Sequence, residues 1–347
     1  MSNINSGQEL LIDMVTFTFF IAAQDKMKVL NKANDKVFQT LYQCHPQRKT
    51  KRGRYKNDYL CKFAKGTKVK LSLYPIKKSH RFVWLEFNPE KLGTVGRILL
   101  RRMLIELLGS DAVLRLYFEA VLTRLDLTLD IFDMERRLYV HRNRVCHSEI
   151  HRHPETCEIL SQIIGSEKSD IRITMYDKDA EQGNSNPDRN YQRIEVKYKY
   201  LNYSMDKLVP ELADIFMFLN FFRDGFLCDK RMSKAFRDDV YNNGLNSALQ
   251  KLPKADRDQY LEYLEDYRAY PINEKALKFA LAHYKALKFL VHNDFRKPEV
   301  KVQKSLINNT RRPIKHWMRS VGHFSQSFFE EYAVIRMAVS KEPRKAV

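Results

Sequence analysis

The sequence predicts an α+β protein in which an antiparallel sheet with packed helices is followed by a mostly helical C-terminal region. Two patterns lead to this fold class. Apolar and polar residues alternate with period two in many segments of the N-terminal half, and apolar residues recur at helical spacing toward the C-terminus. The chain has 347 residues and a hydrophobic content of 44%, which is enough for one large core or two modest ones. We therefore expect two domains.

The N-terminal half combines strands with a smaller number of helices. Alternation, or β-branched and aromatic content, predicts strands at 13–21, 69–74 and 81–87. Helical spacing of apolar residues predicts helices at 27–42 and 95–108. We expect both helices to pack on one face of the sheet.

Strand signals fade after Tyr203, and helical patterns replace them. Four helices are expected, at 208–222, 232–252, 273–292 and 323–339. Asp224 and Gly225 coincide with the change of period, which places a domain boundary near residue 230. The predicted domains are therefore 1–230, which carries the sheet, and 231–347, which is helical and basic.

The charge balance favours a polyanionic partner. The chain carries 61 Lys and Arg against 42 Asp and Glu, a formal net charge of +19. The positively charged side chains would repel one another unless a polyanion binds to the surface. Nucleic acid is the favoured partner, although a ribosome-like or membrane-surface protein would share this balance.

Cysteine usage and the N-terminus indicate a reducing compartment. The five cysteines form no CxxC pair, so neither a disulfide framework nor a zinc ribbon is expected. The apolar run 10–23 follows Glu9 and contains Asp13, which suits a strand better than a signal peptide. No stretch has the length and apolar character of a membrane span. The sequence predicts a cytoplasmic protein.

Two basic clusters are candidates for DNA contact. Segment 47–56 has six basic residues and no acidic one, and its Gly53 and Tyr55 permit close backbone approach and base stacking. The candidates there are Arg48, Lys49, Lys51, Arg52 and Arg54. A second cluster lies between two predicted helices, with candidates Arg311, Arg312 and Lys315. Each cluster is either a phosphate-binding surface or a solvated basic segment.

Three predicted strands, 121–131, 171–178 and 191–200, divide into an apolar and a polar face. The polar faces hold Arg124, Asp126, Thr128 and Asp130 in the first, Arg172, Thr174, Tyr176 and Lys178 in the second, and Arg193, Glu195, Lys197 and Lys199 in the third. Carboxylates, cations and a tyrosine would then converge on one sheet surface. The alternative is an ordinary solvated face with ion pairs of small value.

These residue types match what phosphodiester cleavage requires, namely a nucleophile, charge neutralisation and a hard cation held by oxygen ligands. A tyrosine with a pKa of about 10 is ionised about once in a thousand molecules at pH 7. A metal ion at the phosphate, with Lys178 or Arg172 nearby, would compensate for this low fraction of ionised tyrosine. Spacing alone does not select Tyr176 from the 18 tyrosines.

Residues 10–203 resemble the Rep_trans replication initiators, the family of staphylococcal rolling-circle plasmid initiators and related phage and mobile-element proteins. The matching stretches, in order, are LLIDMVTFTF near the N-terminus, WLEFNPEKL at 84–92, TRLDLTLDIFD at 123–133, GSEKSDIRITMYDKDAE at 165–181 and RIEVKYK at 193–199. The resemblance implies that 1–230 is a nicking-endonuclease-like catalytic domain and that the basic C-terminal region recognises DNA.

The resemblance also implies residue roles. The tyrosine of the family motif R-x-Y-x-K maps onto Tyr176 and its lysine onto Lys178. Arg172 would supply the arginine, although Ile173, Thr174 and Met175 give it a longer spacing than the motif has.

The family's acidic positions map onto Glu86, Asp126 and Glu195 as the metal set, with Asp130 as a spare. Glu86 shares a strand side with Trp84, so it is either a ligand or a buried ion-pair partner. Carboxylate ligands favour Mg²⁺ or Mn²⁺ over zinc. No His-hydrophobe-His triplet occurs, and the segment 151–153 (His-Arg-His) is expected to be a surface loop.

The function implied is that of a bacterial, plasmid-, phage- or mobile-element-encoded enzyme that nicks one strand at a replication origin. It would form a 5′-phosphotyrosine and free a 3′-hydroxyl primer for rolling-circle synthesis. Its implied partners are double-stranded origin DNA with an extruded or single-stranded nick site, a host helicase, DNA polymerase and a second copy in a homodimer. Alternatives are a non-catalytic origin-binding initiator or repressor and a conjugative relaxase.

Overall fold

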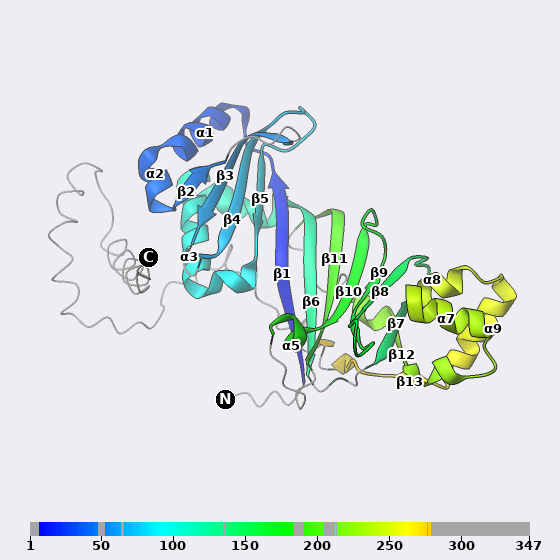
Figure 1. The fold of residues 1–347 in the computed structure, drawn as a ribbon. Helices are drawn as coiled ribbons and strands as arrows, with labels where there is room; N and C mark the ends of the chain where they lie inside the picture. Colours follow the sequence, from blue (N-terminus) through cyan, green and yellow to red (C-terminus); the bar gives the residue numbers. More distant parts are fainter. Residues whose placement is uncertain are drawn as a thin grey trace, which may run out of the picture.

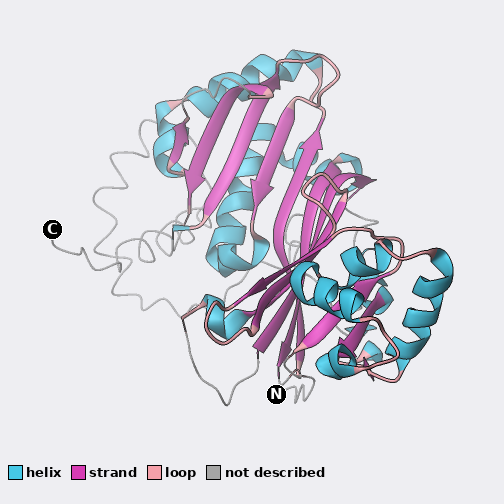
Figure 2. Cartoon of the chain, turned by 45° about the vertical axis from the view of Figure 1, so that its right-hand side comes forward, coloured by secondary structure: helices cyan, strands magenta, loops and turns pink. Residues whose placement is uncertain are grey.

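A computed structural model describes residues 7–47, 53–63, 66–132, 134, 137–183, 191–204, 212, 214–275 and 277–278. It contains a ten-stranded sheet, a three-stranded sheet and the helices that pack on them (Figure 1). Figure 2 shows the long sheet twisting between a helix-covered end and a small helical unit at the other end. The predicted α+β fold class is confirmed.

The long sheet has the order β2-β3-β4-β5-β1-β6-β11-β10-β9-β8, and its neighbouring strands pair antiparallel. Its strands are β1 (Gln8–Phe19), β2 (Cys44–Pro46), β3 (Tyr55–Lys62), β4 (Lys68–Pro75), β5 (Val83–Phe87), β6 (Val121–Phe132), β8 (Ser148–Arg152), β9 (Ile159–Ile164), β10 (Ile171–Asp177) and β11 (Tyr191–Ser204). All six segments predicted as strands lie in this sheet. The prediction missed β2, β3, β8 and β9.

Helices of the N-terminal half pack on one face of this sheet. They are η1 (Ala23–Asp25), α1 (Lys26–Asn34), α2 (Lys36–Leu41), α3 (Pro89–Leu108) and α4 (Ser110–Glu119). Helix α3 contacts β1 and α1, and α1 contacts β4 (Figure 1). Leu100, Met103 and Leu104 of α3 are fully buried in the core. The expectation that helices cover one face is therefore confirmed.

The single helix predicted at 27–42 is two helices. The chain is extended at Asp35, whose carboxylate accepts a hydrogen bond of 3.0 Å from the backbone N–H of Val37. This is an N-cap, and it starts a new helix immediately after α1 ends. Asn88 caps α3 in the same way and Pro89 occupies its first turn, so α3 begins six residues before the predicted start at 95.

A smaller sheet and three helices form a second unit with its own core. The sheet has the order β13-β12-β7. Its strands and their neighbours are β7 (Leu138–Arg142), η4 (Asp214–Phe218), β12 (Leu219–Arg223), η5 (Asp224–Cys228), α7 (Lys234–Asn243), α8 (Leu245–Gln250), α9 (Lys254–Glu265) and β13 (Arg268–Ala269). Tyr139, Phe222, Phe226 and Phe236 are buried together here.

The helix predicted at 208–222 is wrong over its last four residues. Residues 214–218 form the short η4 and 219–223 form a strand. Phe221 packs into the core of the long sheet while Phe222 packs into the second core, so successive side chains point to opposite sides. The segment after Tyr203 is thus not purely helical.

The helix predicted at 232–252 is α7 and α8, separated by Gly244 at φ 87°. Helix α9 was not predicted. The predicted helices at 273–292 and 323–339 lie outside the described residues, apart from a few positions up to 278. The domain limits 1–230 and 231–347 stay predictions. None of the helices in the described ranges is long and apolar enough to cross a membrane.

Candidate functional site

Polar side chains of six neighbouring strands lie on one face of the long sheet, because residues directly opposite each other in antiparallel strands share a face. We call this surface the polar face. Its members are Thr16, Lys70, Glu86, Arg124, Asp126, Thr128, Asp130, Arg172, Thr174, Tyr176, Arg193, Glu195 and Lys197. The structure thus brings the predicted acidic positions, Arg172 and Tyr176 onto one surface.

Three carboxylates of the polar face are buried, unlike those of an ordinary solvated sheet, while Glu195 is half-buried. Asp130 is 1% exposed, Asp126 3% and Glu86 7%. A buried carboxylate requires charged or hydrogen-bonding partners. The partners of these three come from neighbouring strands as well as from their own.

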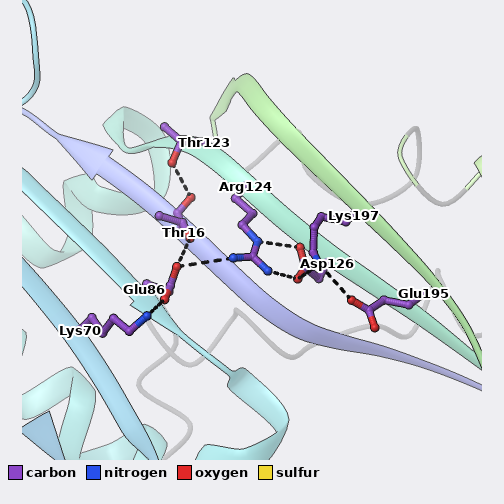
Figure 3. Close-up of polar contacts among 8 residues, drawn as sticks. All are labelled: Thr16, Lys70, Glu86, Thr123, Arg124, Asp126, Glu195 and Lys197. Atoms are coloured by element: carbon purple, nitrogen blue, oxygen red, sulfur yellow. Dashed lines mark hydrogen bonds and ion pairs between the residues drawn. The ribbon is translucent and has the colours of Figure 1, made fainter. Parts of the chain in front are cut away.

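Arg124 and Lys197 surround Asp126 (Figure 3). Arg124 donates two hydrogen bonds to the Asp126 carboxylate, at 2.9 Å and 2.5 Å. The Nζ of Lys197 lies 4.0 Å from Asp126 Oδ2 and 3.6 Å from Glu195 Oε1. Burial raises the pKa of Asp126 above its ordinary value, although Arg124 and Lys197 lower it. Burial also raises the pKa of Glu195, which Asp126 raises further and Lys197 lowers.

Glu86 has its own set of partners. Lys70 on β4 donates to Glu86 Oε1 at 2.7 Å, and Thr16 on β1 donates to Oε2 at 3.3 Å. Arg124 lies 3.8 Å from Oε2 and so links Glu86 to Asp126 (Figure 3). Glu86 is therefore an ion-pair partner in this structure, and its role as a ligand stays a prediction.

Asp130, the spare acidic position, is fully engaged. Arg193 donates two hydrogen bonds to it, at 2.6 Å and 2.7 Å, and the Tyr191 hydroxyl donates a third at 2.5 Å. This arrangement fixes Arg193 on the polar face next to the strand that carries Tyr176.

Tyr176 is half-buried on β10, directly opposite Arg193 on β11. The pKa of Tyr176 is raised to about 12, chiefly by burial and also by the charge of Glu181. The charge of Arg193 and its hydrogen bond with the tyrosine lower that pKa. Arg193 is therefore a cation placed to stabilise the phenolate.

Lys178 and Arg172 flank Tyr176 at different distances. Lys178 begins α5 (Lys178–Glu181), its Nζ lies 5.6 Å from the centroid of the Tyr176 ring, and it pairs with Glu181. Arg172 is four residues away on the same strand, about 13 Å along it. Its buried Nε has no hydrogen-bond partner among the described residues, and one terminal nitrogen lies 3.9 Å from Glu167.

Two kinds of residue on or beside the polar face were not selected from the sequence. Arg193 and Lys197 were placed on this face by alternation but given no role. Asp13 was missed because a β-bulge between Ile12 and Met14 interrupts the alternation of β1. Asp13 accepts a hydrogen bond of 2.9 Å from Asn88, and its charge helps raise the pKa of Asp126 and of Glu195.

The predicted DNA contacts fall mostly outside the described residues. Arg54 is exposed just before β3. Outside the described part lie Arg48, Lys49, Lys51, Arg52, Arg311, Arg312 and Lys315. The surface loop expected at 151–153 is wrong over 151–152, which end strand β8; Arg152 there donates hydrogen bonds to the Tyr139 hydroxyl and to backbone carbonyls.

The metal set stays a prediction as well. Among the described residues, no three His, Cys, Asp or Glu side chains form a group arranged to hold a metal ion. The oxygens of Glu86 and Asp126 are held by lysine and arginine instead. The donor chemistry still suits a hard divalent cation, because Asp126 and Glu195 offer carboxylate oxygens and the charge of Asp126 raises the pKa of Glu195.

Comparison with known proteins gives a structural likeness. No family model matches the chain, and no curated protein sequence matches it. The fold is similar to a solved structure described as a rolling circle replication initiator protein from Geobacillus stearothermophilus, with 14% identity and a TM-score of 0.38. The likeness covers 77% of this chain and 100% of that one. A likeness at this level does not assign a function to this chain.

Proposed function

We propose that this chain is a DNA-nicking enzyme that initiates rolling-circle replication, with Tyr176 as its nucleophile. The main support is the position of Tyr176 directly opposite Arg193, on the same sheet face as Glu195 and Asp126. One surface therefore carries the proposed nucleophile together with cations and carboxylates. The resemblance of residues 10–203 to the Rep_trans initiators supports the same chemistry.

In the proposed reaction, the Tyr176 oxygen attacks a phosphate of a single-stranded segment at the origin. The new bond joins the tyrosine oxygen to phosphorus, and the bond from phosphorus to the 3′-oxygen breaks. The phenol loses its proton, and the departing 3′-oxygen gains one. The products are a 5′-phosphotyrosine and a free 3′-hydroxyl primer. Arg193 would stabilise the phenolate, while Lys178 and Arg172 would contact phosphates.

We propose that Asp126 and Glu195, with Glu86, hold Mg²⁺ or Mn²⁺ when DNA is bound. Such a cation would polarise the scissile phosphate. Burial raises the pKa of both Asp126 and Glu195, and a divalent cation would favour their ionised forms. Arg124 and Lys197 compete for the same oxygens, so metal binding requires these pairs to open.

The metal proposal predicts that Glu195→Gln weakens Mn²⁺ binding by roughly tenfold or more, because it removes one anionic ligand. Calorimetric titration of Mn²⁺ into the protein measures this directly, without DNA and with it. Glu167→Gln is the matched control, since Glu167 is a highly exposed carboxylate whose backbone oxygen accepts a hydrogen bond from Lys199 of β11, the strand of Glu195. Equal affinities for the wild type and Glu195→Gln would remove Glu195 from the metal set.

The nucleophile is tested by covalent capture. Wild-type protein and Tyr176→Phe are incubated, with Mg²⁺ or Mn²⁺, with DNA of the element that encodes the chain, and adducts are resolved on denaturing gels. We expect an adduct with the wild type and none with Tyr176→Phe, because phenylalanine has no nucleophilic oxygen. Tyr200→Phe, which alters an exposed tyrosine of β11, is the control and should keep the adduct.

Other outcomes of this experiment select other functions. An adduct that survives Tyr176→Phe would rule out Tyr176. DNA binding without any adduct would favour the non-catalytic origin-binding initiator or repressor. An adduct at a site that supports transfer between cells but not replication would favour the conjugative relaxase.

The proposed role in initiating rolling-circle replication also implies the remaining partners, which we propose here. Origin DNA would be bound as a duplex with an extruded or single-stranded nick site, and the freed primer would be extended by DNA polymerase after a host helicase is recruited. The protein would act as a homodimer in the bacterial cytoplasm.

A further inference from the structure

Aromatic rings and cations gather where the polar face reaches the end of β1 and the β4–β5 connection. We call this set the stacking surface and define it as Phe20, Tyr74, Phe82 and Trp84 with Lys26, Lys56 and Arg81. Phe20 directly follows β1 and is 67% exposed, although its neighbour Phe19 is buried. A single exposed ring is common on protein surfaces, so the neighbouring rings and cations decide whether this is a binding surface.

Each of three rings has a cation beside its face. Arg81 lies 5.1 Å from the centroid of the Phe20 ring, Lys56 4.4 Å from that of Tyr74 and Lys26 5.8 Å from that of Phe82. Tyr74 and Phe82 also contact each other edge to face, with their centroids 5.8 Å apart. Phe82 itself is buried at 3% exposure, so the accessible aromatic area beside these cations comes from Phe20, Tyr74 and Trp84.

The stacking surface continues the polar face. Trp84 is half-buried and lies opposite Thr18 on β1 and Ser72 on β4. It is two residues from Glu86 on the same strand, so both side chains are on one side of the sheet. Glu86 contacts Arg124, which contacts Asp126 (Figure 3). A chain lying along this side would pass from Phe20 toward the strands that carry Glu195 and Tyr176.

Charge and ring exposure together indicate the occupant. A net charge of +19 and the three cations favour a polyanion. The faces of bases are available to rings only in unpaired strands, and base–aromatic stacking tolerates any base.

We infer that the stacking surface binds single-stranded DNA, stacking bases on Phe20 and Trp84 and holding phosphates with Arg81, Lys56 and Lys26. This inference rests on the proposed function, because the bound strand would be the one presented to Tyr176. The occupant is an unpaired segment several nucleotides from the nick site.

The test compares DNA with and without bases. Fluorescence anisotropy is measured for a labelled oligothymidylate and for an abasic strand of equal length. We expect Phe20→Leu to weaken oligothymidylate binding roughly fivefold or more, the loss of one stacked base, and to leave abasic binding unchanged. Phe20→Trp should restore the affinity because it restores a ring. Phe20 is exposed, so thermal melting should be unchanged in both variants.

Tyr270→Leu is the matched control. Tyr270 is 82% exposed and has Arg268 5.5 Å from its ring centroid, but it follows β13 in the smaller sheet. The Tyr270→Leu variant should bind oligothymidylate with the affinity of the wild type. Equal losses in Phe20→Leu and Tyr270→Leu would overturn the inference, as would an equal loss on abasic DNA or no loss at all.

Two further results separate the possibilities. If Phe20→Leu converts a dimer into a monomer in light scattering, the occupant is a second copy of this chain and the inference fails. Tyr176→Phe should keep its oligothymidylate affinity while losing the adduct. Base-dependent binding in a wild type that forms no adduct would overturn the proposed function and retain the stacking surface.

Discussion

Arg193→Met is expected to lower the free energy of unfolding by about 3–5 kcal/mol, the usual cost of removing one partner from a buried ion pair. Asp130 is 1% exposed and receives two short hydrogen bonds from Arg193. Without Arg193, its carboxylate keeps the Tyr191 hydroxyl as a donor but loses its counter-charge. The buried negative charge would then destabilise the folded state.

Urea unfolding followed by circular dichroism measures this loss. The double variant Arg193→Met, Asp130→Leu should recover much of it, because replacing both members of a buried pair by apolar groups costs little. Arg115→Met is the matched control, since Arg115 pairs with Glu119 on an exposed helix surface, and its loss should stay within about 1 kcal/mol. Similar losses for Arg115→Met and Arg193→Met would contradict the buried-pair interpretation.

The positions of the polar-face residues were predictable from local sequence. Alternation in 121–131 and 191–200 assigns Asp126 and Glu195 to one side of their strands, whatever their neighbours are. That information survives folding because both segments became the long strands β6 and β11. The sequence therefore predicted which side chains share this surface, although it did not predict which of them pair with each other.

The burial and pairing of these residues were not predictable in the same way. Alternation does not distinguish a solvated polar face from a buried one. The partner of Asp130 is set by the register between β6 and β11, which aligns it with Arg193. Register depends on contacts between segments far apart in the chain, and no single segment encodes it.

Tertiary packing explains the elements that were missed. Gln162 is buried in the middle of β9, where its amide donates to the Leu138 carbonyl at 2.6 Å and accepts from the Val140 N–H at 3.2 Å. A polar residue in that position obscures the pattern of a strand, although it joins β9 to β7. Phe221 and Phe222 pack into different cores, so both faces of β12 are apolar. A strand that is apolar on both faces shows no alternation, and its sequence was therefore mistaken for part of a helix.

Adduct formation is expected to accelerate about tenfold per pH unit between pH 7 and pH 9. The pKa of Tyr176 is raised to about 12, mainly by burial. At pH 7 the phenolate is then about one molecule in a hundred thousand, and its fraction grows tenfold for each unit while the pH stays below the pKa. If the phenolate is the attacking species, the rate follows that fraction.

Glu181 gives this prediction a structural control. Its charge raises the pKa of Tyr176, as does that of Glu195, while Arg193 lowers it. Glu181→Gln should therefore lower this pKa and increase the rate at a fixed pH, and it would also release Lys178 from its ion pair. Glu167→Gln should leave the rate unchanged. Single-turnover adduct formation at constant ionic strength and metal concentration measures all three proteins, and a rate independent of pH would show that proton removal from Tyr176 does not limit the attack.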